Sequence, residues 1–381
     1  MDFDLSDSHL ELRRVVRNFC EKELRPHVGA WDRNHHFPAE IVPKLADIGL
    51  LGIKLPVEYG GAGLDILSYV LCVEEVARID GSLGLLIASH NGLGTSHIAK
   101  FGSEAQKQKY LPKAASGEWL AAWALTEPGS GSDSASLTTT ARREDDQWCI
   151  NGSKTFITQG SVGAFCVLLA RTGSDKHRGI SAFIVDRGTP GFSASRTFEK
   201  LGMRASDTAE LSFDDVRVGD AQLIGDEGNG FIDSMKILDI GRISIAALAL
   251  GLAAGALEMA ARYAQERSQF GKPIADFQAI QWMLADSMTE LEAARLLTYR
   301  AAWLADHGRA HGPESSMAKL FASETASRVC NRSLQIHGGY GYTTEFAIER
   351  HFRDAKLTEI GEGTSEIQRL IIARHVLSLW G

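Results

Sequence analysis

The sequence has few cysteines, and their arrangement excludes two classes of small structured site. The five are scattered, odd in number and never spaced as CxxC: Cys20, Cys72, Cys149, Cys166 and Cys330. A disulfide framework or a zinc site is therefore not expected, and a reducing compartment fits this usage. We expect the thiols to be buried and to act as small hydrophobic groups, and we expect no metal site.

Long runs of like charge and long apolar runs are also lacking. The net charge is −8 and no run of Lys or Arg exceeds two residues, which argues against binding to nucleic acid. No apolar run approaches the roughly 20 residues of a membrane span. The N-terminus is acidic without an apolar core, unlike a secretory signal or an Arg-rich transit peptide. These patterns predict a cytoplasmic protein without a membrane partner.

The 381 residues suffice for two or three domains, and 44% apolar with 23% charged residues is typical of a globular chain. Helical periodicity dominates the first third. Leu12, Val15, Val16 and Phe19 follow the i, i+3, i+4, i+7 spacing, and further helices are expected at 38–48, 67–77 and 82–101. The Gly- and Pro-rich segment 55–63 is expected to be a loop. We predict an N-terminal α-helical domain at 1–120.

The periodicity changes near residue 121. Apolar runs typical of strands occur at 165–170, 180–185, 210–213 and 216–218, and the pair Asn151-Gly152 is a strong hairpin signal. We predict a central antiparallel β-sandwich or barrel at 121–228. From Phe231 the pattern is helical again, with a face of small residues suited to close packing. We predict a C-terminal four-helix bundle at 229–381.

One carboxylate stands between two glycines where helical periodicity breaks near the end of the chain. It is Glu362, between Gly361 and Gly363. On such a loop a carboxylate can point into a cavity, where burial raises its pKa toward that of a useful base. The alternative is an ordinary helix end with a solvated glutamate. His90 and Asn91, after a buried run, are either pocket-lining residues or satisfied interior polar groups.

Four other stretches have the composition of ligand-binding loops, although each is also compatible with an ordinary loop, turn or strand. They are LTEPGSGSD at 125–133, NGSKTFIT at 151–158, RSQFG at 267–271 and QIHGGYG at 335–341. Together with EGTSEIQ at 362–368, and in this order, they resemble the acyl-CoA dehydrogenase family. The resemblance extends over essentially the whole chain and is greatest to the short-chain (butyryl-CoA-type) and bacterial branches.

The resemblance implies FAD bound without a covalent link, between the β domain and the bundle, in a homotetramer built as a dimer of dimers. It also implies which residues bind FAD: Leu125, Thr126, Gly131, Ser132, Phe156, Ile157, Thr158, Arg267, Gln269, Phe270, Gln278, Gln335, Gly338, Gly339, Thr364 and Glu366. Phe156 stands where many relatives have Trp. The group from Arg267 to Gly339 would reach the FAD of a neighbouring subunit. Residues implied on the acyl-CoA side are Ser132, Leu238, Asp239, Arg242 and Gly363.

The implied reaction is α,β-dehydrogenation of an acyl-CoA thioester. Glu362 would abstract the α-proton, a hydride would pass from the β carbon to flavin N5, and an electron-transferring flavoprotein would take the electrons. Gly361 stands where relatives often have Tyr, which leaves acyl chain length and branching open, so medium- and branched-chain substrates are alternatives. Some branches carry the base near the position of Gly241, where glycine cannot serve. A flavin monooxygenase or a DNA-associated alkylation-response protein of the same fold is a less favoured alternative.

Overall fold

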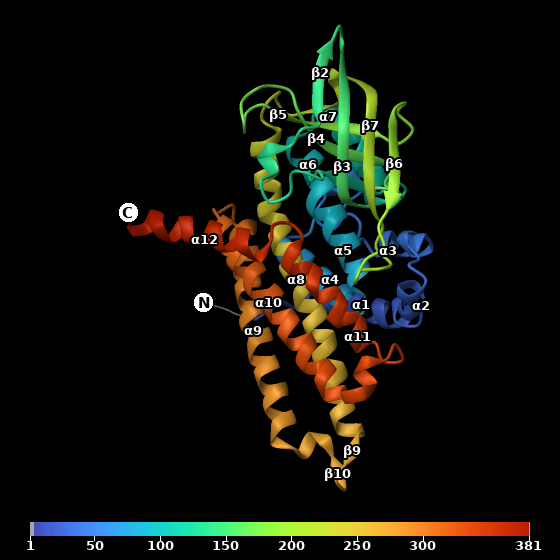
Figure 1. Cartoon of the computed structure of the whole chain (residues 1–381), viewed down its shortest axis with the longest axis vertical. Coiled ribbons are helices and arrows are strands. Elements are labelled where there is room, and N and C mark those ends of the chain that lie inside the picture. The colour runs from blue at the N-terminus through green and yellow to red at the C-terminus, as the bar shows by residue number, and fades with distance from the viewer. Residues whose placement is uncertain (1–3, 381) are drawn as a thin grey trace.

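The computed structural model describes residues 4–380, which form three layers. In Figure 1 the β-sheet lies at one end of the long axis, the C-terminal helices extend to the other end, and the N-terminal helices lie alongside both. Helices form the first part of the chain, a β-sheet the middle and long helices the last part. The predicted fold class, a helical region, a β region and a helical bundle, is confirmed. The boundaries at 120 and 228 remain predictions, although strands run from Ala121 to Ile224 and the next helix begins at Gly230.

From residue 4 onward, the N-terminal layer contains seven α-helices. They are α1 Asp7–Phe19, α2 Val28–Arg33, α3 Val42–Asp47, α4 Ile66–Ala77, α5 Gly81–Ser89, α6 Thr95–Phe101 and α7 Glu104–Ala115. The helix predicted at 82–101 is interrupted, because α5 and α6 are joined by a π-helical turn at His90–Gly94. Thr95 Oγ1 donates a hydrogen bond of 2.7 Å to the carbonyl of His90 in this wider turn.

The β layer is one eight-stranded sheet, with the order β6-β7-β3-β2-β4-β5-β8 and with β1 paired to β4. The strands are β1 Ala121–Ala124, β2 Thr140–Glu144, β3 Gln147–Thr158, β4 Phe165–Arg171, β5 Ile180–Asp186, β6 Phe192–Thr197, β7 Thr208–Gly219 and β8 Leu223–Ile224. The sheet is mixed rather than antiparallel throughout, because β1 runs parallel to β4. Alternate residues of β4 enter two separate hydrophobic clusters, so both of its faces are buried.

The predicted hairpin at Asn151-Gly152 is wrong. Both residues lie inside β3, and the turn of the hairpin falls at Asp145-Asp146, where Asp145 has a φ of +55°. The pairing of β3 with β7 shifts register between Ile150 and Gly152, so the pair marks a β-bulge. The bulge lies opposite the gap between the strands predicted at 210–213 and 216–218, which are therefore one continuous strand, β7.

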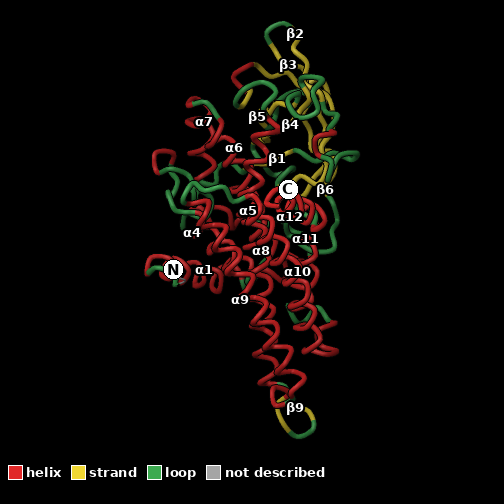
Figure 2. The backbone as a smooth tube through the Cα atoms, turned by 90° about the vertical axis from the view of Figure 1, so that its left-hand side faces the viewer, coloured by secondary structure: helices red, strands yellow, loops and turns green. Residues whose placement is uncertain are grey.

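The C-terminal layer consists of long helices that lie side by side (Figures 1 and 2). They are α8 Gly230–Glu266, α9 Gln278–Asp306, α10 Gly312–His337 and α11 Ile348–Ile360, followed by α12 Ser365–Trp380. The hairpin of β9 Ser268–Gln269 and β10 Lys272–Pro273 joins α8 to α9 at the far end of the bundle (Figure 1). α12 projects sideways from the bundle in the same view.

The central helix α8 corrects the expectation that no apolar segment approaches the length of a membrane span. Among the described residues, it alone is long and apolar enough to cross a membrane by length and composition. However, 78% of its most apolar window is buried inside the structure. α8 packs against α4, α5, α9, α10 and α11, which explains why it needs apolar and small residues on most sides.

Candidate active site

A cavity of about 1000 Å³ lies where the three layers meet. Its walls come from the loop after β1, from the end of β3, from α5 and α8, and from the segment between α11 and α12. Most residues proposed from the sequence line it together: Leu125, Thr126, Gly131, Ser132, Phe156, Ile157, Thr158, Leu238, Arg242, Glu362, Gly363 and Thr364. Segments more than 200 residues apart in the chain thus meet around one space.

Glu362 lies in the break between α11, which ends at Ile360, and α12, which begins at Ser365. Its own φ is +53°, and that of Gly363 is +95°. Gly361 has a φ of −66°, which any residue adopts, so its backbone does not need glycine there. By contrast, the positive φ of Glu362 costs a non-glycine residue of order 1–3 kcal/mol, and such a conformation persists only where the surrounding structure imposes it. The break therefore holds Glu362 in one unusual backbone conformation.

The carboxylate of Glu362 points inward. Part of the residue is accessible, but Oε2 is buried and has no hydrogen-bond partner. Burial raises the pKa of Glu362 to about 7, against the opposing effect of Lys319 and Arg242. A carboxylate with this pKa changes charge near neutral pH, as a general base requires.

Gly241, on the buried side of α8, makes room for this carboxylate. A Cβ atom placed on Gly241 would lie 2.0 Å from Glu362 Oε2 and 3.2 Å from Leu93 Cδ2. Even a methyl group would therefore force the carboxylate to move. Gly361 is different, because a Cβ atom there would meet its nearest neighbour, the carbonyl oxygen of Leu357, at 3.5 Å.

We expect Gly241→Ala to lower the turnover of this site at least tenfold, because a displacement of about 1 Å in a catalytic group costs up to 10²-fold. Gly361→Ala is the matched control, since it adds the same methyl group without a clash, and it should stay within about threefold of the parent. Steady-state kinetics of both variants, with cofactor content measured in parallel, tests this. Equal activities for the two variants would contradict the packing argument.

The loop after β1 is fixed to β3 by a buried ion pair. Lys154 Nζ lies 2.8 Å from Glu127 Oε1, and the two side chains are 0% and 5% exposed. Lys154 Nζ also donates to the carbonyl of Leu125 at 3.0 Å, and the backbone N–H of Thr155 donates to the carbonyl of Thr126 at 2.9 Å. Burial would raise the pKa of Glu127, but Lys154 and the Thr138–Thr139 donors lower it to about 2. The pair stays charged and fixes the cavity wall.

Phe156 faces the cavity because of a second β-bulge. The pairing of β3 with β7 shifts register between Lys154 and Ile157, and Phe156 has a φ of +57°. Because of this shift, the Phe156 side chain does not follow the regular alternation of side chains between the two faces of the strand. The side chain is 63% exposed and its ring centroid lies 4.9 Å from that of Phe198. An exposed aromatic face at a cavity wall is suited to a flat ligand.

The other proposed residues do not line the cavity. Arg267, Gln269, Phe270, Gln278, Gln335, Gly338 and Gly339 lie around the far end of the bundle, next to the β9–β10 hairpin (Figure 1). Phe270 is 94% exposed there. Glu366 is exposed on the first turn of α12, and Asp239 pairs with the guanidinium of Arg242. Within one chain, the proposed site residues therefore form two separate groups.

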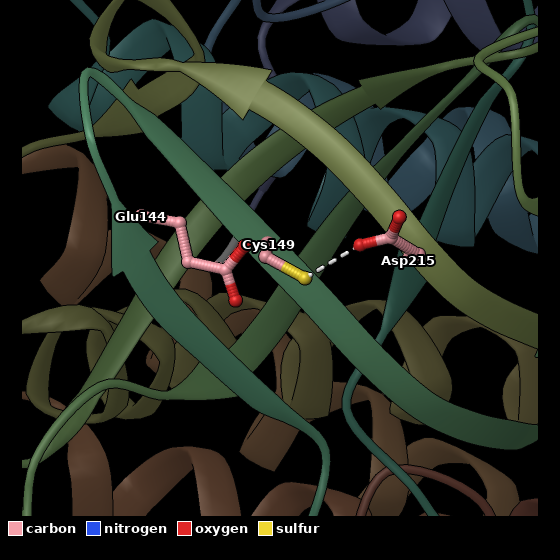
Figure 3. A group of neighbouring side chains, drawn as sticks. All are labelled: Glu144, Cys149 and Asp215. Carbon is pink, nitrogen blue, oxygen red and sulfur yellow. Dashed lines mark hydrogen bonds between the residues drawn. The ribbon is translucent and has the colours of Figure 1, made fainter.

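The described residues contain one group of possible metal ligands, and it lies outside the cavity. Glu144, Cys149 and Asp215, on β2, β3 and β7, have ligand atoms within 4.8 Å of one another (Figure 3). Arg217 Nη2 already lies 3.0 Å from Glu144 and 2.9 Å from Asp215. The Cys149 thiol donates to Asp215, which together with burial raises its pKa. The group is therefore an ion-pair cluster in the sheet, in which Arg217 offsets part of the charge of the two carboxylates.

Comparison with known proteins identifies the family. Models of the acyl-CoA dehydrogenase N-terminal, middle and C-terminal domains match residues 6–118, 122–216 and 228–377. The chain belongs to the acyl-CoA dehydrogenase family. A short-chain specific acyl-CoA dehydrogenase of Clostridium acetobutylicum is 46% identical, over 99% of this chain and 100% of that protein. The resemblance to short-chain and bacterial members is confirmed, and the protein is an oxidoreductase.

Two solved structures agree along the whole chain. Butyryl-CoA dehydrogenase from Megasphaera elsdenii has a TM-score of 0.97 and 40% identity, over 99% of this chain and 100% of that one. A structure described as an electron transferring flavoprotein of Acidaminococcus fermentans, from work on flavin-based electron bifurcation, has a TM-score of 0.97 and 43% identity, with the same coverage.

Several residues of this acyl-CoA dehydrogenase cavity were not expected from the sequence. Leu85, Leu93, Ile245 and Leu248 form an apolar part of its wall, to which Ser89 adds a hydroxyl group. They lie on helical segments, and helical periodicity predicts that a residue is buried but not whether it faces the core or a cavity. The cationic residues Lys176, Lys200, Lys356 and Arg374 also line it. His90 and Asn91 do not: they bond to backbone groups around them, which makes them satisfied interior polar residues.

Proposed function

We propose that this chain oxidises a short-chain acyl-CoA thioester to the trans-2-enoyl-CoA, with Glu362 as the base that removes the α-proton. The observation that carries the proposal is the Glu362 carboxylate, which is buried at the cavity and has one oxygen without a partner. An unpaired buried carboxylate is costly in a folded protein, so its retention here calls for a function.

The chemistry requires a base that is basic enough and correctly placed. The α C–H of a saturated thioester is weakly acidic, and a carboxylate with a pKa near the working pH is an effective base in such a step. The pKa of Glu362 is about 7. The rate of proton removal should therefore rise as the pH increases through about 7. Burial of the carboxylate makes Glu362 a stronger base than a solvated carboxylate.

The residues around the cavity fit FAD as the cofactor. Phe156 presents an aromatic face, Thr126, Ser132 and Thr158 bring hydroxyl groups, and nothing lies within 4 Å of a Cβ placed on Gly131, so a ligand can approach the backbone there. We assign these five residues, with Leu125, Ile157, Thr364 and Glu366, to FAD binding. Bound FAD would supply the acceptor for the hydride that leaves the β carbon.

The proposed substrate side is supported by charge. Lys176, Lys200, Lys356 and Arg374 line a cavity whose remaining wall is largely apolar. Lys176 pairs with Asp133 and Lys356 with Glu359, whereas among the described residues Lys200 and Arg374 form no ion pair, so these two add net positive charge. Cationic side chains attract phosphate groups, and an apolar pocket accepts an acyl chain, so together they suit an acyl-CoA. We assign Leu238, Asp239, Arg242, Ser132 and Gly363 to this side.

We also propose that the active protein is a homotetramer that passes electrons to an electron-transferring flavoprotein. The far-end group of Arg267, Gln269, Phe270, Gln278, Gln335, Gly338 and Gly339 would contact the FAD of a neighbouring subunit. Exposed apolar side chains support association: Leu377 and Trp380 on α12 are 72% and 81% exposed, and Trp282 on α9 is 62% exposed. The likeness to the Acidaminococcus structure supports the electron acceptor.

Anaerobic titration with acyl-CoAs tests the function. We expect butyryl-CoA to bleach the flavin absorbance of the purified protein, and a panel from four to sixteen carbons, with isobutyryl- and isovaleryl-CoA, to give the highest kcat/KM among short chains. The space at Gly361 is the reason to include branched substrates. If no acyl-CoA bleaches the flavin, the proposed dehydrogenation is wrong; if only longer or branched chains do, the chain-length assignment is wrong.

A further inference from the structure

A lysine lies directly beneath the segment that carries Glu362. Lys319, on α10, is 0% exposed, and its Nζ donates a hydrogen bond of 2.8 Å to the carbonyl of Gly363. Gln368 Nε2, from the first turns of α12, donates to the same carbonyl at 2.9 Å. The peptide that follows Glu362 is therefore held from two helices.

The charge of Lys319 is not neutralised by a contacting carboxylate. Within the described part of the chain, Lys319 forms no ion pair within 4 Å, whereas Glu359 pairs with Lys356 and Arg242 pairs with Asp239. Burial lowers the pKa of Lys319 to about 8, against the raising effect first of Glu362 and then of Glu359. A buried cation is costly unless a nearby anion compensates it. The buried, unpaired carboxylate of Glu362 is the largest such influence here.

We propose that Lys319 is a positioning residue for the base: its buried charge stabilises the carboxylate form of Glu362, and its hydrogen bond to the Gly363 carbonyl fixes the peptide that follows Glu362. This inference rests on the proposed role of Glu362. The lysine does not touch the substrate, since it lies outside the cavity wall. It acts through the loop and through charge.

The other ionisable groups near Glu362 cannot replace this charge. Arg242, from α8, also lowers the pKa of Glu362, but its guanidinium is already bonded to Asp239. Tyr69, from α4, is neutral, because burial raises its pKa. Lys319, from α10, is the first cause that opposes burial at Glu362. Its removal should therefore move the titration of Glu362 to higher pH.

Two substitutions separate the charge from the hydrogen bond. Lys319→Gln removes the charge and keeps a donor for the Gly363 carbonyl, whereas Lys319→Met removes both. In both holoenzymes we expect the pH midpoint of flavin reduction to rise by about one unit, because an opposite charge close by shifts a carboxyl pKa by one to three units. At pH 6 the rate should fall about tenfold. At high pH, Lys319→Gln should recover more of the rate than Lys319→Met.

The same titration is followed without turnover by infrared difference spectroscopy, with the carboxyl band assigned through its loss in Glu362→Gln. Arg369→Met is the matched control, because Arg369 also joins α12 to α10, through Glu324, but on the exposed surface; its midpoint should equal that of the parent. Unchanged midpoints in both folded Lys319 variants would overturn the inference. Failure of the parent to react with any acyl-CoA would instead refute the proposed function, while the infrared titration would still decide the role of Lys319.

Discussion

Glu362→Gln is expected to lower the rate of flavin reduction by an acyl-CoA about 10²- to 10⁴-fold, the usual contribution of a positioned general base. Glutamine keeps the size and shape of the side chain but cannot accept the α-proton. The amide should also remain folded in place, because the neutral group is easier to bury than the carboxylate. Anaerobic stopped-flow measurement at saturating butyryl-CoA gives this rate directly.

Two further measurements make the Glu362→Gln result specific. FAD content and the dissociation constant for acyl-CoA should stay within about threefold of the parent, because neither depends on the charge of the base. Glu324→Gln, at a partly exposed position of α10 that pairs with Arg369, is a control in which the same chemical change should leave the rate unaltered. A Glu362→Gln protein that turns over at the parent rate would refute the assignment of the base.

The second large effect is expected from the buried ion pair that fixes the cavity wall. Lys154→Met should lower the free energy of unfolding by about 3–5 kcal/mol, because it leaves the Glu127 carboxylate buried without its cation. Glu127 would keep its backbone donors at Thr138 and Thr139, at 2.6 and 2.9 Å. These donors do not replace the lost charge. Since the carbonyl of Leu125 loses its Lys154 donor in the same step, and only the backbone bond from Thr155 to Thr126 still joins the loop to β3 there, FAD content should fall as well.

The urea midpoint and the flavin absorbance per chain measure both parts of the Lys154→Met prediction. The double variant Lys154→Met, Glu127→Gln should recover part of the lost stability, because it removes the uncompensated charge. Glu144→Gln breaks an exposed pair in the same sheet and should cost at most about 1 kcal/mol. A loss as small as this in Lys154→Met would show that the buried pair does not support the wall.

The sequence predicted elements well where periodicity was local and strong. Strands β4 and β5 are predicted within one residue of their bounds, and both the loop at 267–271 and the break at Glu362 fall between helices as expected. The hairpin at Asn151-Gly152 was not a hairpin, because the same residue pair also suits a bulge, and only the pairing partner β7 decides between the two. The preferences of the residues themselves do not reveal which strand pairs with them.

The active-site residues also include some that the sequence predicted and some that only the structure revealed. The order of the motifs pointed to the residues that line the cavity, but not to Gly241 or Lys319, whose roles depend on contacts across more than 40 residues of chain. The two glycines beside Glu362 looked alike in the sequence. Only the structure separates Gly363, which needs its positive φ, from Gly361, which leaves space. Backbone conformation and long-range packing were the missing information.

The continuous helix α8 has a consequence for how the molecule unfolds. It extends for 37 residues and packs against helices of the N-terminal layer, helices of the bundle and strand β5. No boundary in the chain can therefore open without exposing part of its apolar surface to water. The three segments seen in the sequence should behave as one cooperative unit rather than as separable modules. Because Gly241 and Arg242 belong to α8, substitutions that disturb the packing of α4 or α5 on this helix should also alter the surroundings of Glu362.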